Sequence, residues 1–187
     1  HLKILFAEIW ALVKSRGHMD RAEVRRVLIS YLEQPIVKAL VRMGFTPNLL
    51  TILGLAVAGS SSYLISTGNL WAGGIMLLVS GAFDVLDGGV ARATGRASSF
   101  GALLDSIVDR VSEVIVLLGL LIFYLDQSSN EGVILVYLTL SGSILVSYLR
   151  ARAEGLGIEC KVGVMQRPER VVTLGIGLIV GWWWPTF

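Results

Sequence analysis

Residues 84–109 read DVLDGGVARATGRASSFGALLDSIVD and place four aspartates among small and apolar residues. The surrounding chain is 54% hydrophobic, with a mean hydropathy of +0.71. Carboxylates inside membrane helices are energetically costly and usually mark functional sites. The aspartates of this stretch are therefore the candidate functional residues, and they are Asp84, Asp87, Asp105 and Asp109.

The composition places the chain among membrane proteins. Of its 187 residues 54% are hydrophobic and 16% charged; a soluble domain of this length has no use for so much apolar surface, and a disordered chain would have far less. This length suits one compact unit. The net charge of +2 argues against a nucleic-acid-binding protein. Cys160 is the single cysteine, so an internal disulfide framework is excluded, and we expect a spectator thiol there.

Five apolar segments predict membrane-spanning helices, since each approaches the ~20 residues that a helix needs to cross ~30 Å of hydrocarbon. Continuous apolar runs of this length favour helices over a closed barrel. The segments are residues 48–67, 70–92, 99–125, 132–153 and 168–184. Ahead of them, residues 20–44 mix basic and apolar positions, which predicts an amphipathic helix on the membrane surface. The predicted fold class is an all-α integral membrane protein, with an N-terminal amphipathic surface helix plus five transmembrane helices.

Basic residues are concentrated on one side of this predicted topology. The connections 66–69 and 126–131 contain no lysine or arginine, whereas the N-terminal helix and residues 92–99 and 150–170 are rich in them. The positive-inside rule places the basic segments in the cytoplasm. Residues 182–184, three tryptophans, then lie at the opposite face, where aromatic belts occur. We expect a multi-pass protein of the cell membrane whose aspartates face the cytoplasm.

The N-terminal end differs from the rest. The chain starts at His1, and Gly17-His18-Met19-Asp20 resembles a junction between joined sequences. We expect residues 1–19 to be a foreign or linker segment and residues 20–187 to form the membrane domain.

Helical spacing predicts that the four carboxylates converge. Asp84 and Asp87 are three residues apart, and Asp105 and Asp109 are four apart, so each pair shares one helix face. A short loop near 94–98 joins the two helices, which makes them antiparallel neighbours. Four carboxylates at one depth would repel each other strongly. Hard divalent cations that prefer oxygen ligands, Mg²⁺ or Mn²⁺, would neutralise them.

Small residues share the faces that carry the aspartates. Gly88 and Ala91 continue the face of the first pair, and Gly101 lies one turn before Asp105. A glycine costs about 1 kcal/mol relative to alanine in a helix interior, so we expect these positions to leave room for a ligand. Close helix packing is the alternative for Gly89 and for Gly73 and Gly74. Together with bound metal, Arg92 suits a pyrophosphate whose developing charge must be stabilised.

The pattern Asp-x2-Asp-Gly-x2-Ala-Arg-x8-Gly-x3-Asp-x3-Asp resembles that of the CDP-alcohol phosphotransferase family, with every fixed position filled. Thr46-Pro47-Asn48 and the layout of residues 20–184 also resemble the family. Its members displace CMP from a CDP-linked lipid by attack of an alcohol. The resemblance implies a homodimer and two metal ions, with Asp109 as general base. It implies that the metal ligands are Asp84, Asp87, Asp105 and Asp109. It implies that the cytidine diphosphate group is bound by Asp84, Asp87, Gly88, Ala91, Arg92 and Gly101.

A second basic region indicates an acceptor that carries its own phosphate. Arginine forks suit phosphate, and the helix start at Pro168 favours an anion. The candidate phosphate ligands are Arg150, Arg152, Lys161, Arg167 and Arg170. Topology signals alone are the alternative for Arg152 and Lys161.

The runs Tyr-x-Arg-Ala-Arg-Ala-Glu and Arg-Pro-Glu-Arg resemble those of the phosphatidylinositol-phosphate synthase branch. This implies transfer from CDP-diacylglycerol, or an archaeal ether analogue, to inositol 1-phosphate. Phosphatidylglycerophosphate synthase, which uses glycerol 3-phosphate, is the alternative. The family normally has six spans and this chain has five up to Phe187, so we expect a truncated chain or an absent last helix.

Two other classes remain open at this level. A membrane prenyltransferase also binds Mg²⁺ and pyrophosphate through aspartate-rich helices, but it gives no reason for the fixed glycines, Ala91 and Arg92. A divalent-cation carrier requires polar residues across the whole membrane, whereas the outer halves of the predicted spans are largely apolar.

Overall fold

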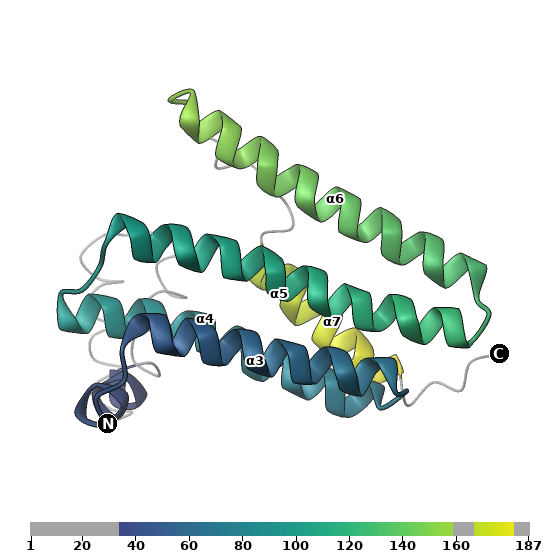
Figure 1. Cartoon of the computed structure of the whole chain (residues 1–187), viewed down its shortest axis with the longest axis horizontal. Coiled ribbons are helices and arrows are strands. Elements are labelled where there is room, and N and C mark those ends of the chain that lie inside the picture. Colours follow the sequence, from purple (N-terminus) through teal and green to yellow (C-terminus); the bar gives the residue numbers. More distant parts are fainter. Residues whose placement is uncertain (1–33, 159–166, 182–187) are drawn as a thin grey trace, which may run out of the picture. The chain divides into compact units, whose positions relative to one another are not determined.

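The computed structural model describes residues 34–158 and 167–181, and within these ranges all regular structure is helical. A helical stretch at 34–42 precedes the labelled helices (Figure 1). These are α3 (Pro47–Ser66), α4 (Leu70–Thr94), α5 (Ser99–Asp126), α6 (Asn130–Gly155) and α7 (Arg167–Gly181). The all-α prediction is confirmed. Residues 1–33, Cys160, Lys161 and the three tryptophans lie outside the described residues.

The chain divides into two compact units, and the division falls within α4. Of the described residues, one unit contains 34–47 and 85–97, and the other contains 48–84, 98–158 and 167–181. Asp87 therefore belongs to the smaller unit, and Asp84, Asp105 and Asp109 belong to the larger one.

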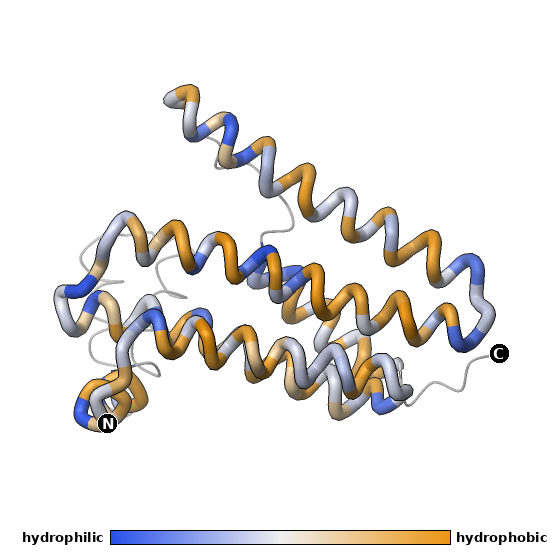
Figure 2. Tube along the Cα trace, viewed as in Figure 1, coloured by the Kyte–Doolittle hydropathy of each residue, from blue (hydrophilic) through white to orange (hydrophobic). Residues whose placement is uncertain are grey.

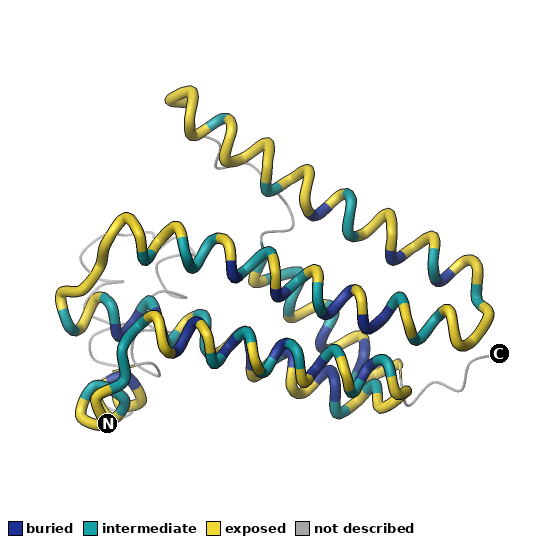
Figure 3. Tube along the Cα trace, in the orientation of Figure 1, coloured by how far each residue is buried: buried dark blue, intermediate teal, exposed yellow. Residues whose placement is uncertain are grey.

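The core of the larger unit lies where one face of each of its helices meets the others. It is formed by Ala58, Ile65, Leu77, Val116, Leu117, Leu120, Val136 and Leu178. The outward faces are also strongly apolar, and Figures 2 and 3 show many hydrophobic positions along the helices that are exposed. Tyr63 and Leu135, for example, are 69% and 63% exposed. Exposed apolar surface on this scale requires lipid or partner contact.

Three of the described helices are long and apolar enough to cross a membrane, namely α3, α4 and α6. Helix α5 is longer, with 28 residues, but it carries several charged side chains that include Asp109 and Glu113. Helix α7 is described over 15 residues. The multi-pass character is thus confirmed, and five spans stay a prediction. Of the predicted surface helix at 20–44, the part at 34–42 is helical.

Small and hydroxylated residues let the helices of the larger unit approach closely. Ser61 Oγ donates to the carbonyl of Gly73 at 2.8 Å, and Ser62 Oγ donates to that of Ile115 at 2.6 Å. Between α4 and α7, a Cβ on Gly74 would lie only 2.8 Å from the carbonyl oxygen of Gly175. Such contacts are typical of helices packed in a membrane.

Two local signals set the ends of the helices that carry the aspartates. Gly95 has φ +64°, a left-handed conformation that ends α4, and Arg96 N donates to the carbonyl of Ala91 at 3.1 Å. Ser98 begins α5 as its N-cap, because its Oγ accepts from Gly101 N at 3.0 Å.

Candidate functional site

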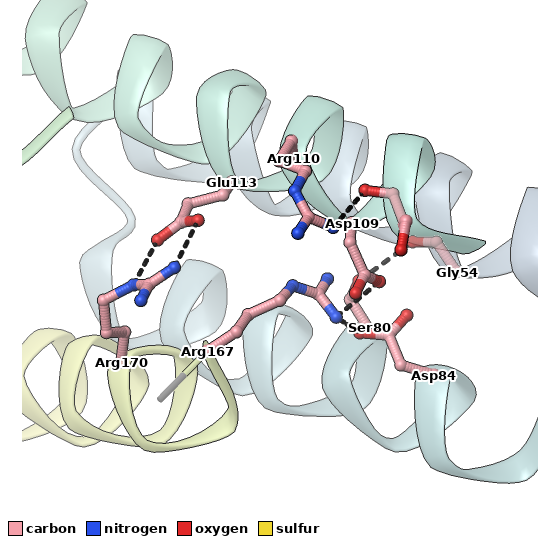
Figure 4. Close-up of polar contacts among 9 residues, drawn as sticks. Gly54, Ser80, Asp84, Asp109, Arg110, Glu113, Arg167 and Arg170 are labelled. Atoms are coloured by element: carbon pink, nitrogen blue, oxygen red, sulfur yellow. Dashed lines mark hydrogen bonds and ion pairs between the residues drawn. The ribbon is translucent and has the colours of Figure 1, made fainter. Parts of the chain in front are cut away.

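One arginine lies between two of the predicted aspartates in the larger unit (Figure 4). Arg167 Nη1 lies 2.9 Å from Asp84 Oδ2 and 2.5 Å from Asp109 Oδ1. The three side chains are only 20%, 16% and 15% exposed, respectively. Because Asp84 comes from α4 and Asp109 from α5, a single positive group of α7 links carboxylates of two other helices.

Asp105 completes the group of carboxylates in this unit. Its negative charge lies close enough to act on both Asp84 and Asp109. Among the described residues, Asp105 Oδ1, Asp109 Oδ1 and Arg167 Nε are buried without a hydrogen-bond partner. The contact between Asp109 Oδ1 and Arg167 is therefore an ion pair without hydrogen-bond alignment. The structure brings three of the four predicted aspartates together.

The described part of the chain contains no group of three His, Cys, Asp or Glu side chains already at metal-binding spacing. The donor set nevertheless fits a hard divalent cation, since it offers carboxylate oxygens only. Asp105 Oδ1 lacks a partner that a cation would supply, and Arg167 already places positive charge between the other two carboxylates.

The smaller unit contains the other predicted donor-binding residues. Asp87 is buried, with 4% of its surface exposed. Arg92 lies one turn after Gly88 on α4, and a Cβ on Gly88 would lie 3.2 Å from Arg92 Nη1. Ala91 is half-buried and Arg92 is exposed. Gly88 therefore allows the Arg92 side chain to fold along its own helix.

Gly101 has a structural reason of its own. A Cβ at this position would lie 3.2 Å from Ser98 Oγ, the group that caps α5. The absence of a side chain thus protects the cap, alongside any contact with a ligand.

The predicted acceptor residues separate into two groups. Arg167 and Arg170 lie at the carboxylates, at the start of α7. Arg150 Nε instead donates to Glu154 on its own helix at 3.1 Å, with both side chains at least half exposed. Arg152 is exposed on the same helix, and Lys161 lies outside the described residues.

Two contributors were missed in the sequence. Glu113 accepts from Arg170 at both oxygens, at 2.8 and 3.1 Å (Figure 4). Its position four residues after Asp109 extends the i, i+4 series of Asp105 and Asp109, which is the signal that was available. Gly54 of α3 was also missed, and a Cβ there would lie 3.5 Å from Asp84 Oδ1.

A cavity of about 210 Å³ adjoins this group of charges. Its charged end is formed by Asp84, Glu113, Arg167 and Arg170. Most of the remaining lining is apolar and includes Leu77, Val116, Leu117, Val171 and Leu174. A cavity with one charged end and an apolar body suits an amphiphilic ligand.

Comparisons with known proteins agree with this chemistry. The family model for CDP-alcohol phosphatidyltransferase matches residues 45–185. The chain is 36% identical over 154 residues to archaetidylinositol phosphate synthase of Methanothermobacter thermautotrophicus, which covers 80% of this chain and 76% of that protein. The crystal structure of Mycobacterium tuberculosis phosphatidylinositol phosphate synthase with CDP-DAG bound is similar, with a TM-score of 0.76, 35% identity and coverage of 83% and 81%. A structure of the same mycobacterial protein in complex with manganese and citrate gives a TM-score of 0.71, 36% identity and coverage of 79% and 71%.

Proposed function

The chain belongs to the CDP-alcohol phosphatidyltransferase family, and from this premise we propose that it makes a phosphatidylinositol-phosphate-type lipid. The donor is CDP-diacylglycerol or an archaeal ether analogue, the acceptor is inositol 1-phosphate, and CMP is released. The match of the family model to residues 45–185 favours this class of enzyme over a membrane prenyltransferase or a divalent-cation carrier.

The proposed reaction is a direct displacement at phosphorus. The acceptor hydroxyl oxygen forms a bond to the phosphorus that carries the lipid alcohol, and the bond from that phosphorus to the CMP phosphate oxygen breaks. CMP leaves with the electron pair, and the hydroxyl proton moves to the carboxylate of Asp109. A hydroxyl is a poor nucleophile at neutral pH, so a carboxylate base beside it assists the attack. The position of Asp109, 15% exposed beside Asp84 and Arg167, supports this role.

We assign metal binding to Asp84, Asp87, Asp105 and Asp109, with two Mg²⁺ or Mn²⁺ ions. Bound divalent cations supply neutralisation of the pyrophosphate charge and stabilisation of the leaving CMP. Support comes from the carboxylate-only donor set and from the spacing of Asp84 and Asp87 on one continuous helix. The similar mycobacterial protein has been crystallised with manganese.

Gly88, Ala91, Arg92 and Gly101 line the cytidine diphosphate group in this proposal. Arg92 is exposed and carries the positive charge that a pyrophosphate requires. The apolar cavity with its charged end supports a lipid donor whose tails stay in the bilayer. We assign the active site to the cytoplasmic face, since the positive-inside rule predicts the basic connections on that side. We also assign a homodimer, by analogy with the family.

The single observation that carries the acceptor assignment is the position of Arg167 and Arg170 at the carboxylates. Two arginines beside the reacting group suit an acceptor with its own phosphate better than free inositol. Glycerol 3-phosphate would use the same arginines, so it remains the alternative. Similarity to an archaetidylinositol phosphate synthase and to a phosphatidylinositol phosphate synthase favours inositol 1-phosphate.

The test is CMP release by the purified protein with CDP-diacylglycerol and Mg²⁺. Inositol 1-phosphate, glycerol 3-phosphate and free inositol are compared as acceptors. Release with inositol 1-phosphate alone supports the proposal, and release with glycerol 3-phosphate alone keeps the mechanism but overturns the acceptor. No release with any of them, in protein that still binds CDP-diacylglycerol, overturns the proposed reaction.

A further inference from the structure

We propose that Arg167 is an internal competitor of the divalent cation: it neutralises Asp84 and Asp109 in the metal-free protein and is displaced when metal binds. This inference rests on the proposed function, because it takes the aspartates to be the metal ligands. It adds a role for Arg167 that precedes any contact with the acceptor.

The geometry of the contact is that of a point charge between two carboxylates. Arginine usually binds one carboxylate through two parallel hydrogen bonds. Arg167 instead uses the single nitrogen Nη1 for both Asp84 Oδ2 and Asp109 Oδ1, at 2.9 and 2.5 Å. A cation shared by the two helices would bind the same carboxylates and lie beside the guanidinium, so the repulsion between the two positive groups opposes their binding at once.

The contact is also incomplete, which makes exchange possible. Arg167 Nε is buried without a hydrogen-bond partner among the described residues, and Asp105 Oδ1 is in the same condition. A divalent cation accepts several oxygen ligands and would satisfy Asp105 as well as the other two. Arg170 differs from Arg167, since its two bonds to Glu113 anchor the first turn of α7. The helix therefore has one anchored arginine and one that exchanges.

This competition weakens the apparent affinity for metal. The measured Kd equals the intrinsic Kd divided by the fraction of molecules in which the carboxylates are open. If Arg167 has left them in roughly 1–10% of metal-free molecules, the Kd is raised about 10- to 100-fold. After displacement, the guanidinium keeps its charge beside the site, where it is available to an anion.

The test measures Mn²⁺ binding to the full chain in detergent, without nucleotide or lipid, from the electron paramagnetic resonance signal of free Mn²⁺. Arg167→Gln is expected to bind Mn²⁺ about 10- to 100-fold more tightly than the unaltered protein. Arg110→Gln is the matched control, because Arg110 adjoins Asp109 but donates to the backbone carbonyl of Ser106. It removes the same charge without opening the carboxylates. No gain in Arg167→Gln, or an equal gain in Arg110→Gln, overturns the proposal.

A second measurement follows the displacement itself and does not depend on a charge-removing variant. In the nuclear magnetic resonance spectrum of protein with ¹⁵N-labelled arginine, the Nε signal of Arg167 is identified by its absence from the spectrum of Arg167→Lys. This signal is expected to shift when Mg²⁺ is added. A signal that stays unchanged while Mg²⁺ binds overturns the proposal.

Asp105→Asn separates this proposal from the metal assignment. If Asp105→Asn binds Mn²⁺ more weakly but Arg167→Gln does not bind it more tightly, the competition is contradicted and the metal assignment stands. If Asp105→Asn binds Mn²⁺ as tightly as the unaltered protein, both the metal assignment and the competition are contradicted.

Discussion

Arg170 of α7 and Glu113 of α5 form a two-bond ion pair, with Nε 2.8 Å from Oε1 and Nη2 3.1 Å from Oε2. The residues are 57 positions apart in the chain. Their side chains are only 16% and 13% exposed. The pair fixes the start of α7 against α5, three residues after the arginine that contacts the aspartates.

Glu113→Gln is expected to lower the free energy of unfolding by about 3–5 kcal/mol, because it leaves Arg170 charged and largely buried. Denaturation in detergent with increasing sodium dodecyl sulfate measures this. Glu154→Gln is the matched control, since it breaks the exposed pair with Arg150 and should cost under about 1 kcal/mol. Equal losses in the two variants would contradict a structural role for the Glu113 pair.

Asp109→Asn is expected to reduce turnover by about 10²- to 10⁴-fold, because the amide cannot take up the proton of the attacking hydroxyl. Binding of the CDP-lipid should be largely retained. CMP release and equilibrium binding of CDP-diacylglycerol check the two statements separately. Turnover within a few-fold of the unaltered protein would show that another group is the base.

Gly54→Ala is expected to reduce turnover and Mn²⁺ affinity together. The added Cβ would lie 3.1 Å from Phe83 Cβ and 3.5 Å from Asp84 Oδ1, so it shifts the carboxylate or its helix. Gly59→Ala, on the same helix α3, meets nothing within 4 Å and is the control. CMP release and Mn²⁺ titration should change in the first variant only. If Gly54→Ala behaves like Gly59→Ala, the position of Asp84 does not depend on Gly54.

Ser98→Ala is expected to lower the free energy of unfolding by about 1 kcal/mol, since it removes the hydroxyl that accepts from Gly101 N. Ser98→Asp keeps a side-chain acceptor at this N-cap and should restore most of the loss. The same detergent denaturation measures both. A Ser98→Asp variant as unstable as Ser98→Ala would contradict the capping role.

The positions of the helices, and the helix faces that carry the carboxylates, could be predicted from the sequence because both follow from local properties of the chain. The helix period is a local property, so the spacing of Asp105 and Asp109 places both on one face of α5 whatever the rest of the chain does. The lengths of α3, α4 and α6 likewise follow from continuous apolar runs.

The roles of the arginines show where local reasoning ends. Arg150 and Arg170 both belong to basic runs and look equivalent as phosphate ligands. In the structure Arg150 pairs with Glu154 on its own helix, while Arg170 reaches Glu113 on another. Which carboxylate an arginine meets depends on which helices pack together.

The sequence by itself therefore determined the helical membrane class, the faces that carry the aspartates and the family to which their spacing belongs. Only the tertiary structure decided that Arg167 lies between Asp84 and Asp109 and that Glu113 anchors Arg170. The contact between Arg167 and Asp84 requires α7 to pack closely on α4, which the small residues Gly74 and Gly175 permit. Such packing joins segments about a hundred residues apart, and no local period in the chain encodes it.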